Sequence, residues 1–280
     1  MGLKIAMNQS MIMQCQTEEF ISLCAKKGIK AVELRIPKLK ETLCHMSHNE
    51  LAGLLKAHGV SVLSVNAIED FSMVPRDNLD LLKMEYEWVG RMCEMVGCNM
   101  VVAPVARWFG SPPSREEVIT LSQERLRYVA DIFKPFGVNI GFEPISFPEF
   151  TVKDLELSQT IIDGSGAEGV GFVIDIYNLF PGGIKPEELT KLKYPIYLMH
   201  INDAEDSPLE NLHVLHNRVF PGEGVANAKA WVQAVLQAGY QGYFSLELFR
   251  QEIWDMNPEE AVSLCHNKLR KFAELVENVS

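Results

Sequence analysis

The chain has 280 residues, of which 47% are hydrophobic and 22% charged, a composition typical of a folded globular protein. Its formal net charge of −11 argues against a sequence-independent hold on nucleic acid, because no basic surplus exists to neutralise phosphates. It has no apolar run near the roughly 18 residues of a membrane span, no signal-peptide pattern in MGLKIAMNQS and no CxxC among its six cysteines, so we expect a cytoplasmic protein with reduced thiols and no membrane partner.

Eight short segments predict β-strands. Each is nearly continuous in apolar residues, as expected of strands that are buried on both faces of a sheet, and does not alternate as a half-solvated strand would. The segments cover residues 3–8, 31–36, 62–68, 99–105, 139–145, 170–177, 196–203 and 243–249.

Helices are predicted between these strands. The amphipathic segments cover residues 17–28, 47–58, 79–96, 114–133, 153–163, 185–191 and 226–238, and a last one begins near residue 257. Ser114 followed by Glu117 is typical of a capping box, and Asn257 followed by Pro258 is typical of an N-cap with proline in the first turn. Eight strands that each precede a helix predict an α/β fold, a single (β/α)8 TIM barrel over residues 1–280.

A doubly wound sheet is the structural alternative. It is disfavoured because the first strand ends in NQS (residues 8–10) and no GxGxxG motif follows it. No change in composition marks a second domain. The longest irregular segment, residues 203–225, is too long for a plain connector, and in a barrel it would lie on the active face, after the seventh strand.

Four polar residues lie near the ends of four successive predicted strands. They are embedded in the apolar contexts GFEPI, VIDIY, LMHIN and SLELF, and they are Glu143, Asp175, His200 and Glu247. A barrel would bring them together at its carboxyl-terminal mouth, where three unpaired carboxylates would repel one another. Because these strand ends contain no lysine or arginine, one divalent cation (Mn²⁺, Zn²⁺, Co²⁺ or Mg²⁺) is the predicted partner, although a buried acid or histidine taken alone is more often paired within the protein.

Such a site favours metal-assisted proton transfer or hydrolysis, because no GxSxG motif and no strand-end lysine is present. A metal that grips a ketone and the adjacent hydroxyl would acidify the carbon-bound proton and hold the resulting enediolate. Glu143 and Glu247, at the two ends of the set, are the predicted acid and base.

Other polar or aromatic residues are candidates for substrate contacts, with solvated rim residues as the plain alternative. Trp108, after the fourth strand, is a candidate for stacking on a sugar or cyclitol, or simply closes the barrel mouth. Arg218, in the loop after the seventh strand, is a candidate for orienting a substrate oxygen. The strand-end candidates for binding hydroxyls are Asn8, Glu33, Arg35 and Asn66.

Several motifs together resemble one known family. They are HIND (200–203), R-x-F-PGEG (218–224), SLELF (245–249), VELR (32–35), VNA (65–67) and ELFRQE (247–252). With the Glu…Asp…His…Glu order, they resemble the xylose isomerase-like TIM barrels, a group that holds sugar isomerases and epimerases, inosose dehydratase and endonuclease IV. Within that group the chain is most similar to the 2-keto-myo-inositol (inosose) isomerases.

The resemblance implies roles for individual residues. The four strand-end residues would be the metal ligands, with Glu143 and Glu247 also acting as acid and base. Glu149, six residues after the first ligand, would contact substrate, and Arg218 would hold substrate oxygens. Many relatives carry histidine three residues after the second ligand, but Asn178 stands there and cannot become a cation near neutral pH, which puts the substrate and the reaction in question.

The leading hypothesis is a metal-dependent isomerase or epimerase of a small keto sugar or keto-inositol. The alternative is a dehydratase of inosose or 3-dehydroshikimate on the same barrel, in which the enolate expels a β-hydroxyl. Phosphodiester hydrolysis of the endonuclease IV kind needs several metals, and only His200 among the seven histidines ends a strand. A non-catalytic sugar-binding barrel is the fourth interpretation, and an acidic barrel of this kind is compatible with self-association.

Overall fold

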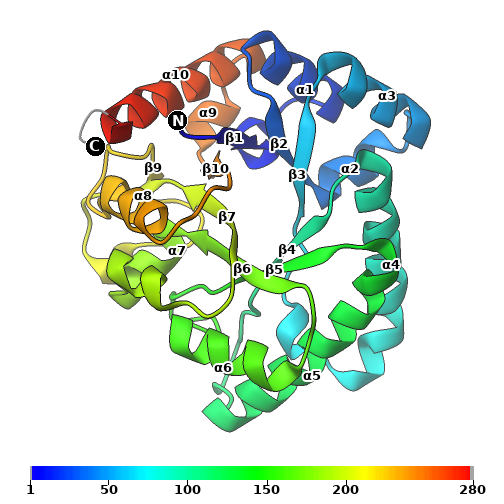
Figure 1. The fold of residues 1–280 in the computed structure, drawn as a ribbon, viewed down its shortest axis with the longest axis vertical. Helices are drawn as coiled ribbons and strands as arrows, with labels where there is room; N and C mark the ends of the chain where they lie inside the picture. The colour runs from blue at the N-terminus through cyan, green and yellow to red at the C-terminus, as the bar shows by residue number, and fades with distance from the viewer. Residues whose placement is uncertain (1, 278–280) are drawn as a thin grey trace.

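A computed structural model describes residues 2–277 of the chain, and within them eight parallel strands close into a barrel (Figure 1). The barrel strands are β1 (Ile5–Asn8), β2 (Ala31–Arg35), β3 (Ser61–Asn66), β4 (Met100–Pro104), β5 (Asn139–Glu143), β6 (Val170–Asp175), β7 (Ile196–Ile201) and β10 (Phe244–Leu246). Strand β10 pairs with both β7 and β1, and this pairing closes the sheet. All eight predicted strands and the barrel are confirmed.

Helices surround the barrel in Figure 1. They are α1 (Thr17–Lys26), α2 (Ile36–Thr42), α3 (His48–His58), α4 (Leu79–Val96), α5 (Arg115–Phe133), α6 (Leu155–Ser165), α7 (Ile176–Leu179), α8 (Ala228–Gln237), α9 (Gln251–Trp254) and α10 (Pro258–Glu277). Short 3₁₀ helices cover Gln9–Ile12, Phe71–Met73, Arg76–Asn78, Lys134–Phe136, Phe180–Gly182, Pro186–Lys191 and Leu209–Asn211. Among the described residues, no helix is both long enough and apolar enough to cross a membrane.

The local start signals explain where the main helices begin. The Ser114 hydroxyl accepts a hydrogen bond from the backbone N–H of Glu117, whose carboxylate accepts one from the backbone N–H of Ser114, as the predicted capping box requires. The Asn257 side chain accepts from the backbone N–H of Glu259 at the start of α10.

One predicted helix is wrong in type. Residues 185–191 form the 3₁₀ helix Pro186–Lys191, and the other helical segments between β6 and β7 are the short α7 and the 3₁₀ turn Phe180–Gly182. The sequence FPGGIKP (180–186) gives the reason, because its two prolines lack the N–H group that an α-helix needs and its glycines favour other conformations.

The layer beneath the strand-end residues is small and mostly apolar. Alternate residues of a barrel strand point inward, so the residues two positions before the four strand-end residues share their face. Of these, Val173 and Leu198 are buried in an apolar cluster inside the barrel. Gly141 makes room for it, because a Cβ atom there would overlap the side chain of Val173.

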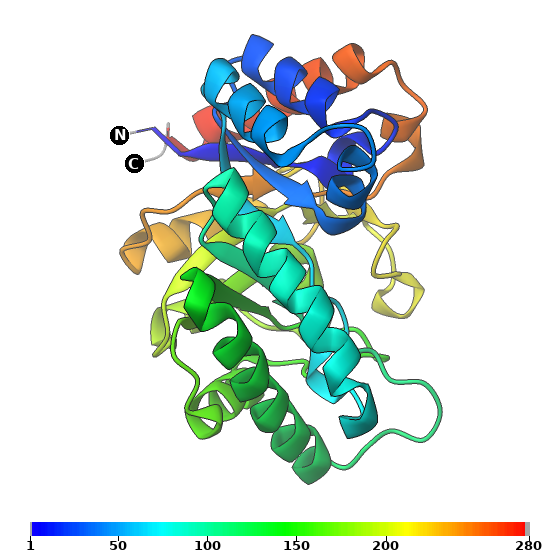
Figure 2. The ribbon, with the colours of Figure 1, turned by 90° about the vertical axis from the view of Figure 1, so that its right-hand side faces the viewer.

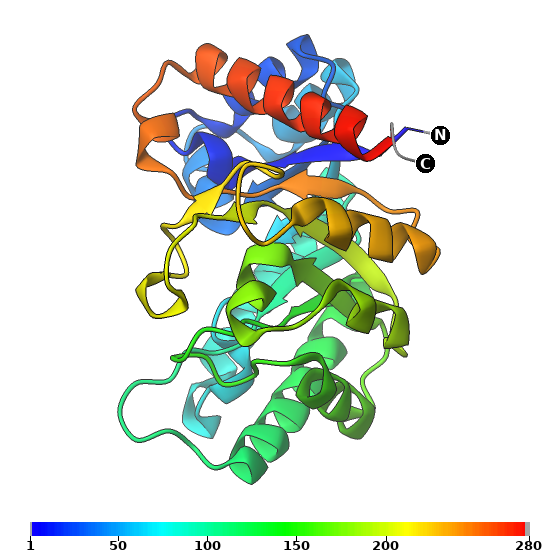
Figure 3. The same ribbon diagram turned by 90° about the vertical axis from the view of Figure 1, so that its left-hand side faces the viewer.

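Two long loops project on the side of the barrel opposite the chain termini (Figures 2 and 3). One loop follows β4, and the other lies between the short strands β8 (Asp203–Ala204) and β9 (Arg218–Val219). Strands β8 and β9 pair antiparallel, with Ala204 opposite Arg218. This hairpin was not predicted, but it confirms that residues 203–225 are more than a connector and lie at the carboxyl-terminal face.

Candidate metal centre

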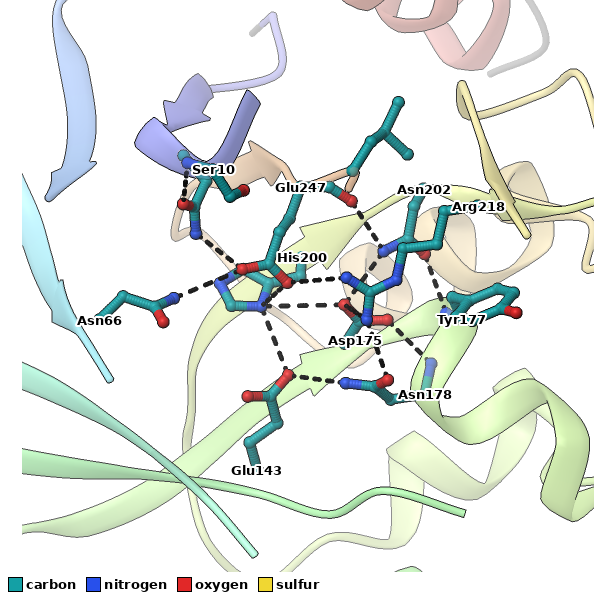
Figure 4. Close-up of polar contacts among 12 residues, drawn as sticks. Ser10, Asn66, Glu143, Asp175, Tyr177, Asn178, His200, Asn202, Arg218 and Glu247 are labelled. Atoms are coloured by element: carbon teal, nitrogen blue, oxygen red, sulfur yellow. Dashed lines mark hydrogen bonds and ion pairs between the residues drawn. The ribbon is translucent and has the colours of Figure 1, made fainter. Parts of the chain in front are cut away.

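The four predicted strand-end residues converge at the mouth of the barrel (Figure 4). Each of Glu143, Asp175, His200 and Glu247, called here the four-residue cluster, offers one ligand atom, and these atoms all lie within 4.8 Å of one another. Asp175 and His200 are register partners on β6 and β7, Glu143 ends β5, and Glu247 directly follows β10. All four residues are buried, with Asp175 and His200 fully inaccessible.

The surroundings of the His200 ring test whether these residues fit a cation. Nδ1 has no hydrogen-bond partner, although it lies 3.3 Å from Glu247 Oε2, 3.5 Å from Glu143 Oε1 and 4.0 Å from Asp175 Oδ2. A lone pair that faces three carboxylates is repelled unless a positive charge lies between them. Oxygen and imidazole donors at these separations suit one divalent first-row ion, whose ligands lie at about 2.0–2.2 Å.

The pKa values of His200 and Asp175 are both shifted toward the protonated form in the metal-free cluster. Burial lowers the pKa of His200, but the charges of Glu247 and Glu33 outweigh burial and hold this pKa well above its usual value. Burial raises the pKa of Asp175, and the nearby Arg218 charge opposes the rise. Without an ion, the cluster therefore recruits protons to balance its carboxylates.

Glu33 lies behind His200 and not at the surface of the cavity. The Glu33 side chain is fully buried, and its carboxylate lies 3.1 Å from His200 Nε2. The hydroxyl groups of Ser64 and Ser245 also donate to it. Burial raises the pKa of Glu33, but His200 and the two serines outweigh burial and lower this pKa to about 2. The expectation that Glu33 binds substrate does not fit this position, because Glu33 is fully buried and does not line the cavity.

Arg218 and Asn178 form a second polar group beside the cluster (Figure 4). The Arg218 guanidinium is 2% exposed and lies 3.2 Å from Asp175 Oδ2 and 3.3 Å from Glu247 Oε2. Asn178 donates from Nδ2 to Glu143 Oε1 at 3.0 Å and accepts at Oδ1 from Arg218 at 2.9 Å. Asn178 thus links a predicted ligand to the buried cation.

A cavity of about 310 Å³ reaches the four-residue cluster, and pockets that bind small molecules usually occupy about 300–1,000 Å³. Of the cluster, Glu143 and Glu247 line the cavity. Its polar wall contains Arg35, Asn66, Asn178 and Arg218. Its apolar wall includes Met13, Val214, Leu215, Phe249 and Trp254.

Two predicted substrate contacts lie elsewhere. Trp108 and Glu149 line a separate hollow with prolines 112, 113 and 148, and neither lines the cavity at the four-residue cluster. The Trp108 indole N–H donates to the carbonyl oxygen of Ser111, and the Trp108 backbone N–H donates to the carbonyl oxygen of Glu149. These contacts join the loop after β4 to the segment after β5, and a substrate contact for either residue stays a prediction.

Sequence reasoning did not predict a site role for Asn202. Its side chain donates to Asp175 Oδ2 at 3.0 Å and to the carbonyl oxygen of Glu247 at 3.2 Å, and it accepts from the backbone N–H of Tyr177 at 2.9 Å. Asn202 therefore ties together the strand ends that carry two of the carboxylates. The available signal was its position within HIND, two residues after His200.

Comparison with known proteins agrees with this geometry. The chain is 29% identical to an inosose isomerase of Bacillus velezensis over 263 residues, which cover 93% of each chain. A crystal structure described as IOLI protein with a binding zinc atom matches with a TM-score of 0.91 and 27% identity, and the match covers 98% of this chain and 99% of that one. A 3-dehydroshikimate dehydratase of Pseudomonas aeruginosa is 23% identical over 82% of this chain but only 36% of its own length.

The family model described as xylose isomerase-like TIM barrel matches residues 21–271. This span includes every barrel strand except β1 and all four residues of the cluster. The closed barrel, the buried donor set at its mouth and this match lead to one conclusion: the chain belongs to the xylose isomerase-like TIM barrel family.

Proposed function

We propose that this protein is a divalent-metal-dependent isomerase of a keto-inositol, which moves a ketone to the neighbouring hydroxyl-bearing carbon of a cyclitol ring. One observation carries the proposal. A chain that matches an inosose isomerase over 93% of both lengths places three carboxylates and one imidazole around a single point, at a cavity of small-molecule size. The dehydratase match is weaker and covers a minor part of that protein, so isomerisation is the favoured interpretation.

Glu143, Asp175, His200 and Glu247 would hold the ion, because these residues present converging donors. When bound, a divalent cation supplies Lewis-acid polarisation of a ketone and the adjacent hydroxyl. The protein supplies an enclosed site around this point, since each of the four residues is at most 4% exposed.

Glu143 and Glu247 would transfer the protons. They are the members of the cluster that line the cavity, whereas Asp175 and His200 are fully buried. One glutamate removes the proton from the hydroxyl-bearing carbon, and the C–H electron pair becomes the C=C bond of an enediol as the ketone oxygen is protonated. The other glutamate delivers a proton to the former carbonyl carbon. The neighbouring hydroxyl supplies the proton that the first ketone oxygen gains, and its own oxygen becomes the new ketone.

Arg218, Asn178 and Asn66 would orient the ring hydroxyls. All three line the cavity, and Arg218 is held rigidly because its guanidinium lies 5.2 Å from the ring centre of Tyr177 and 4.9 Å from that of Phe249. With asparagine in place of the histidine found in many relatives, Asn178 contributes hydrogen bonds without adding a titrating cation.

The test is turnover of inosose in D₂O by protein loaded with Zn²⁺ or Mn²⁺, followed by NMR. We expect a second ketone isomer with deuterium in the carbon positions that exchange. An absorbance typical of a conjugated dione would assign dehydration instead. Absence of any reaction with every metal would leave a non-catalytic binding barrel and would overturn the proposal.

Matched substitutions separate catalysis from folding. Glu143→Gln and Glu247→Gln should lower kcat at least ~100-fold, measured at saturating metal, because each removes a proton-transfer group. Glu274→Gln, on α10 with a side chain that is 63% exposed, should leave kcat unchanged. Full activity of either cavity variant would refute the assignment of acid and base.

The cytoplasmic location, the single-domain organisation and self-association remain predictions.

A further inference from the structure

The carboxylate of Glu33 is buried against four side-chain donors and the His200 ring. Oε1 accepts from Asn8 Nδ2 at 3.2 Å and from Ser245 Oγ at 2.5 Å. Oε2 accepts from Ser64 Oγ at 2.5 Å and from Asn66 Nδ2 at 3.4 Å, and it lies 3.1 Å from His200 Nε2. A carboxylate has about four lone-pair sites, so Glu33 has no capacity left for a substrate hydroxyl.

The contact with His200 decides which ring nitrogen carries the proton. A carboxylate accepts hydrogen bonds and cannot donate them, so Nε2 must carry a hydrogen toward Glu33. In the neutral ring, Nδ1 is then the unprotonated donor atom, and Nδ1 is the atom that faces Glu143, Asp175 and Glu247 without a hydrogen bond. The opposite tautomer would place a lone pair against the Glu33 carboxylate.

Glu33 is also coupled to a second member of the cluster. Asn8 Nδ2 donates to Glu33 and, at 2.8 Å, to Glu247 Oε1. Asn66 Nδ2 donates to the same two carboxylates at 3.4 and 3.5 Å. The strand register supports this arrangement, since Asn8 is paired with Glu33 across β1 and β2, and Glu33 with Ser64 across β2 and β3.

We propose that Glu33 is a positioning residue for the metal: it fixes the His200 tautomer and, through Asn8 and Asn66, the carboxylate of Glu247. Partners of this kind on the far nitrogen of a ligating histidine typically change metal affinity about 10- to 100-fold. The inference rests on the metal site and not on the identity of the substrate. The role of Glu33 can therefore be refuted while the isomerase assignment stands, and the isomerase assignment can be refuted while the role of Glu33 stands.

The test compares Zn²⁺ affinity in Glu33→Gln and Ser64→Ala, measured by competition with a chromophoric chelator. The Glu33→Gln substitution keeps the length of the side chain but directs an NH₂ group at hydroxyl and amide donors, so we expect about 10- to 100-fold weaker binding. Ser64→Ala removes one donor to Glu33, and among the described residues no hydrogen bond joins the Ser64 side chain to His200 or Glu247, so we expect a change below about threefold. An unchanged affinity in Glu33→Gln, or equal losses in both variants, would overturn the proposal.

A measurement on the unsubstituted protein keeps the proposal testable if Glu33→Gln does not fold. In the ¹⁵N–¹H correlation spectrum of the Zn²⁺-loaded protein, the His200 signals can be assigned by their loss in His200→Gln. We expect a proton on Nε2 and none on Nδ1. A proton on Nδ1 in the metal-loaded protein would contradict the role given to Glu33.

Discussion

Arg218→Met isolates the electrostatic role of the buried guanidinium. Methionine keeps an unbranched stem of similar reach between Tyr177 and Phe249 but removes the positive charge. In the metal-free protein, Asp175 and Glu247 then lose their contacts with the guanidinium while both remain buried. We expect the substitution to destabilise the metal-free protein severely.

The magnitude follows from two opposed terms. At 3.2 and 3.3 Å and an effective dielectric constant of about 20, each ion pair contributes about 5 kcal/mol of Coulomb attraction. Desolvation of the guanidinium offsets much of this, and breaking a buried pair by removing one partner costs about 3–5 kcal/mol. We therefore expect the free energy of unfolding to fall by about 3–5 kcal/mol, a large part of the usual total of about 5–15 kcal/mol.

The assay is urea unfolding of chelator-treated protein at about pH 7.5, followed by circular dichroism. With an m value of about 3 kcal/mol/M, the midpoint should fall by about 1–1.7 M. Arg270→Met is the matched control, because Arg270 is 61% exposed and lies 3.6 Å from Glu274 on the helix surface; it should change stability by less than about 0.5 kcal/mol. A loss below about 1 kcal/mol for Arg218→Met would refute the argument that this cation balances the cluster.

Three further predictions follow from other features of the structure. Burial lowers the pKa of His200, but Glu247 and Glu33 hold this pKa well above 6.5. The metal-free protein should therefore lose stability as the pH rises above about 6.5, while Zn²⁺ binding becomes tighter. A Zn²⁺ affinity that is independent of pH would contradict this prediction. Iodoacetamide should modify one thiol of the native protein, Cys44, because this cysteine is exposed and the other five are buried. Mass spectrometry after brief labelling gives the number of modified thiols, and rapid modification of several thiols would refute the prediction. Gly224→Ala should destabilise the protein by about 1–3 kcal/mol, because the added Cβ would overlap the backbone of Ala204. Gly53→Ala lies in α3 with open space around it and should stabilise the protein by about 0.5–1 kcal/mol. Urea unfolding of the two variants measures both changes.

The barrel and its four-residue cluster could be predicted because both follow from local patterns in the sequence. Strands buried on both faces require continuous apolar runs, so a charged residue at the end of such a run is conspicuous. In a parallel barrel all strand ends meet at one mouth, so strand order alone brought Glu143, Asp175, His200 and Glu247 together. Helix starts such as Ser114 were equally local, since a capping box involves residues only three apart.

Contacts between distant strands could not be predicted in this way. Glu33 and Asn66 were expected at the substrate for the same reason, as polar residues of β2 and β3. The structure buries Glu33 against His200, 167 residues away, and leaves Asn66 at the cavity wall. Which of two neighbouring polar residues points behind a ligand depends on strand stagger and twist around the closed barrel, and neither is visible in a single sequence.

The paths of the loops could not be predicted from the sequence either. Trp108 and Glu149 follow β4 and β5, but the loops carry them to a separate hollow, while the β8–β9 hairpin brings Arg218 back onto Asp175 and Glu247. The sequence by itself determined the barrel, the donor set and its need for a cation, because strand burial and charge repulsion are local or additive. Only the tertiary structure decided which polar residues support the donors and which face the cavity, because side-chain direction depends on the packing of segments far apart in the chain.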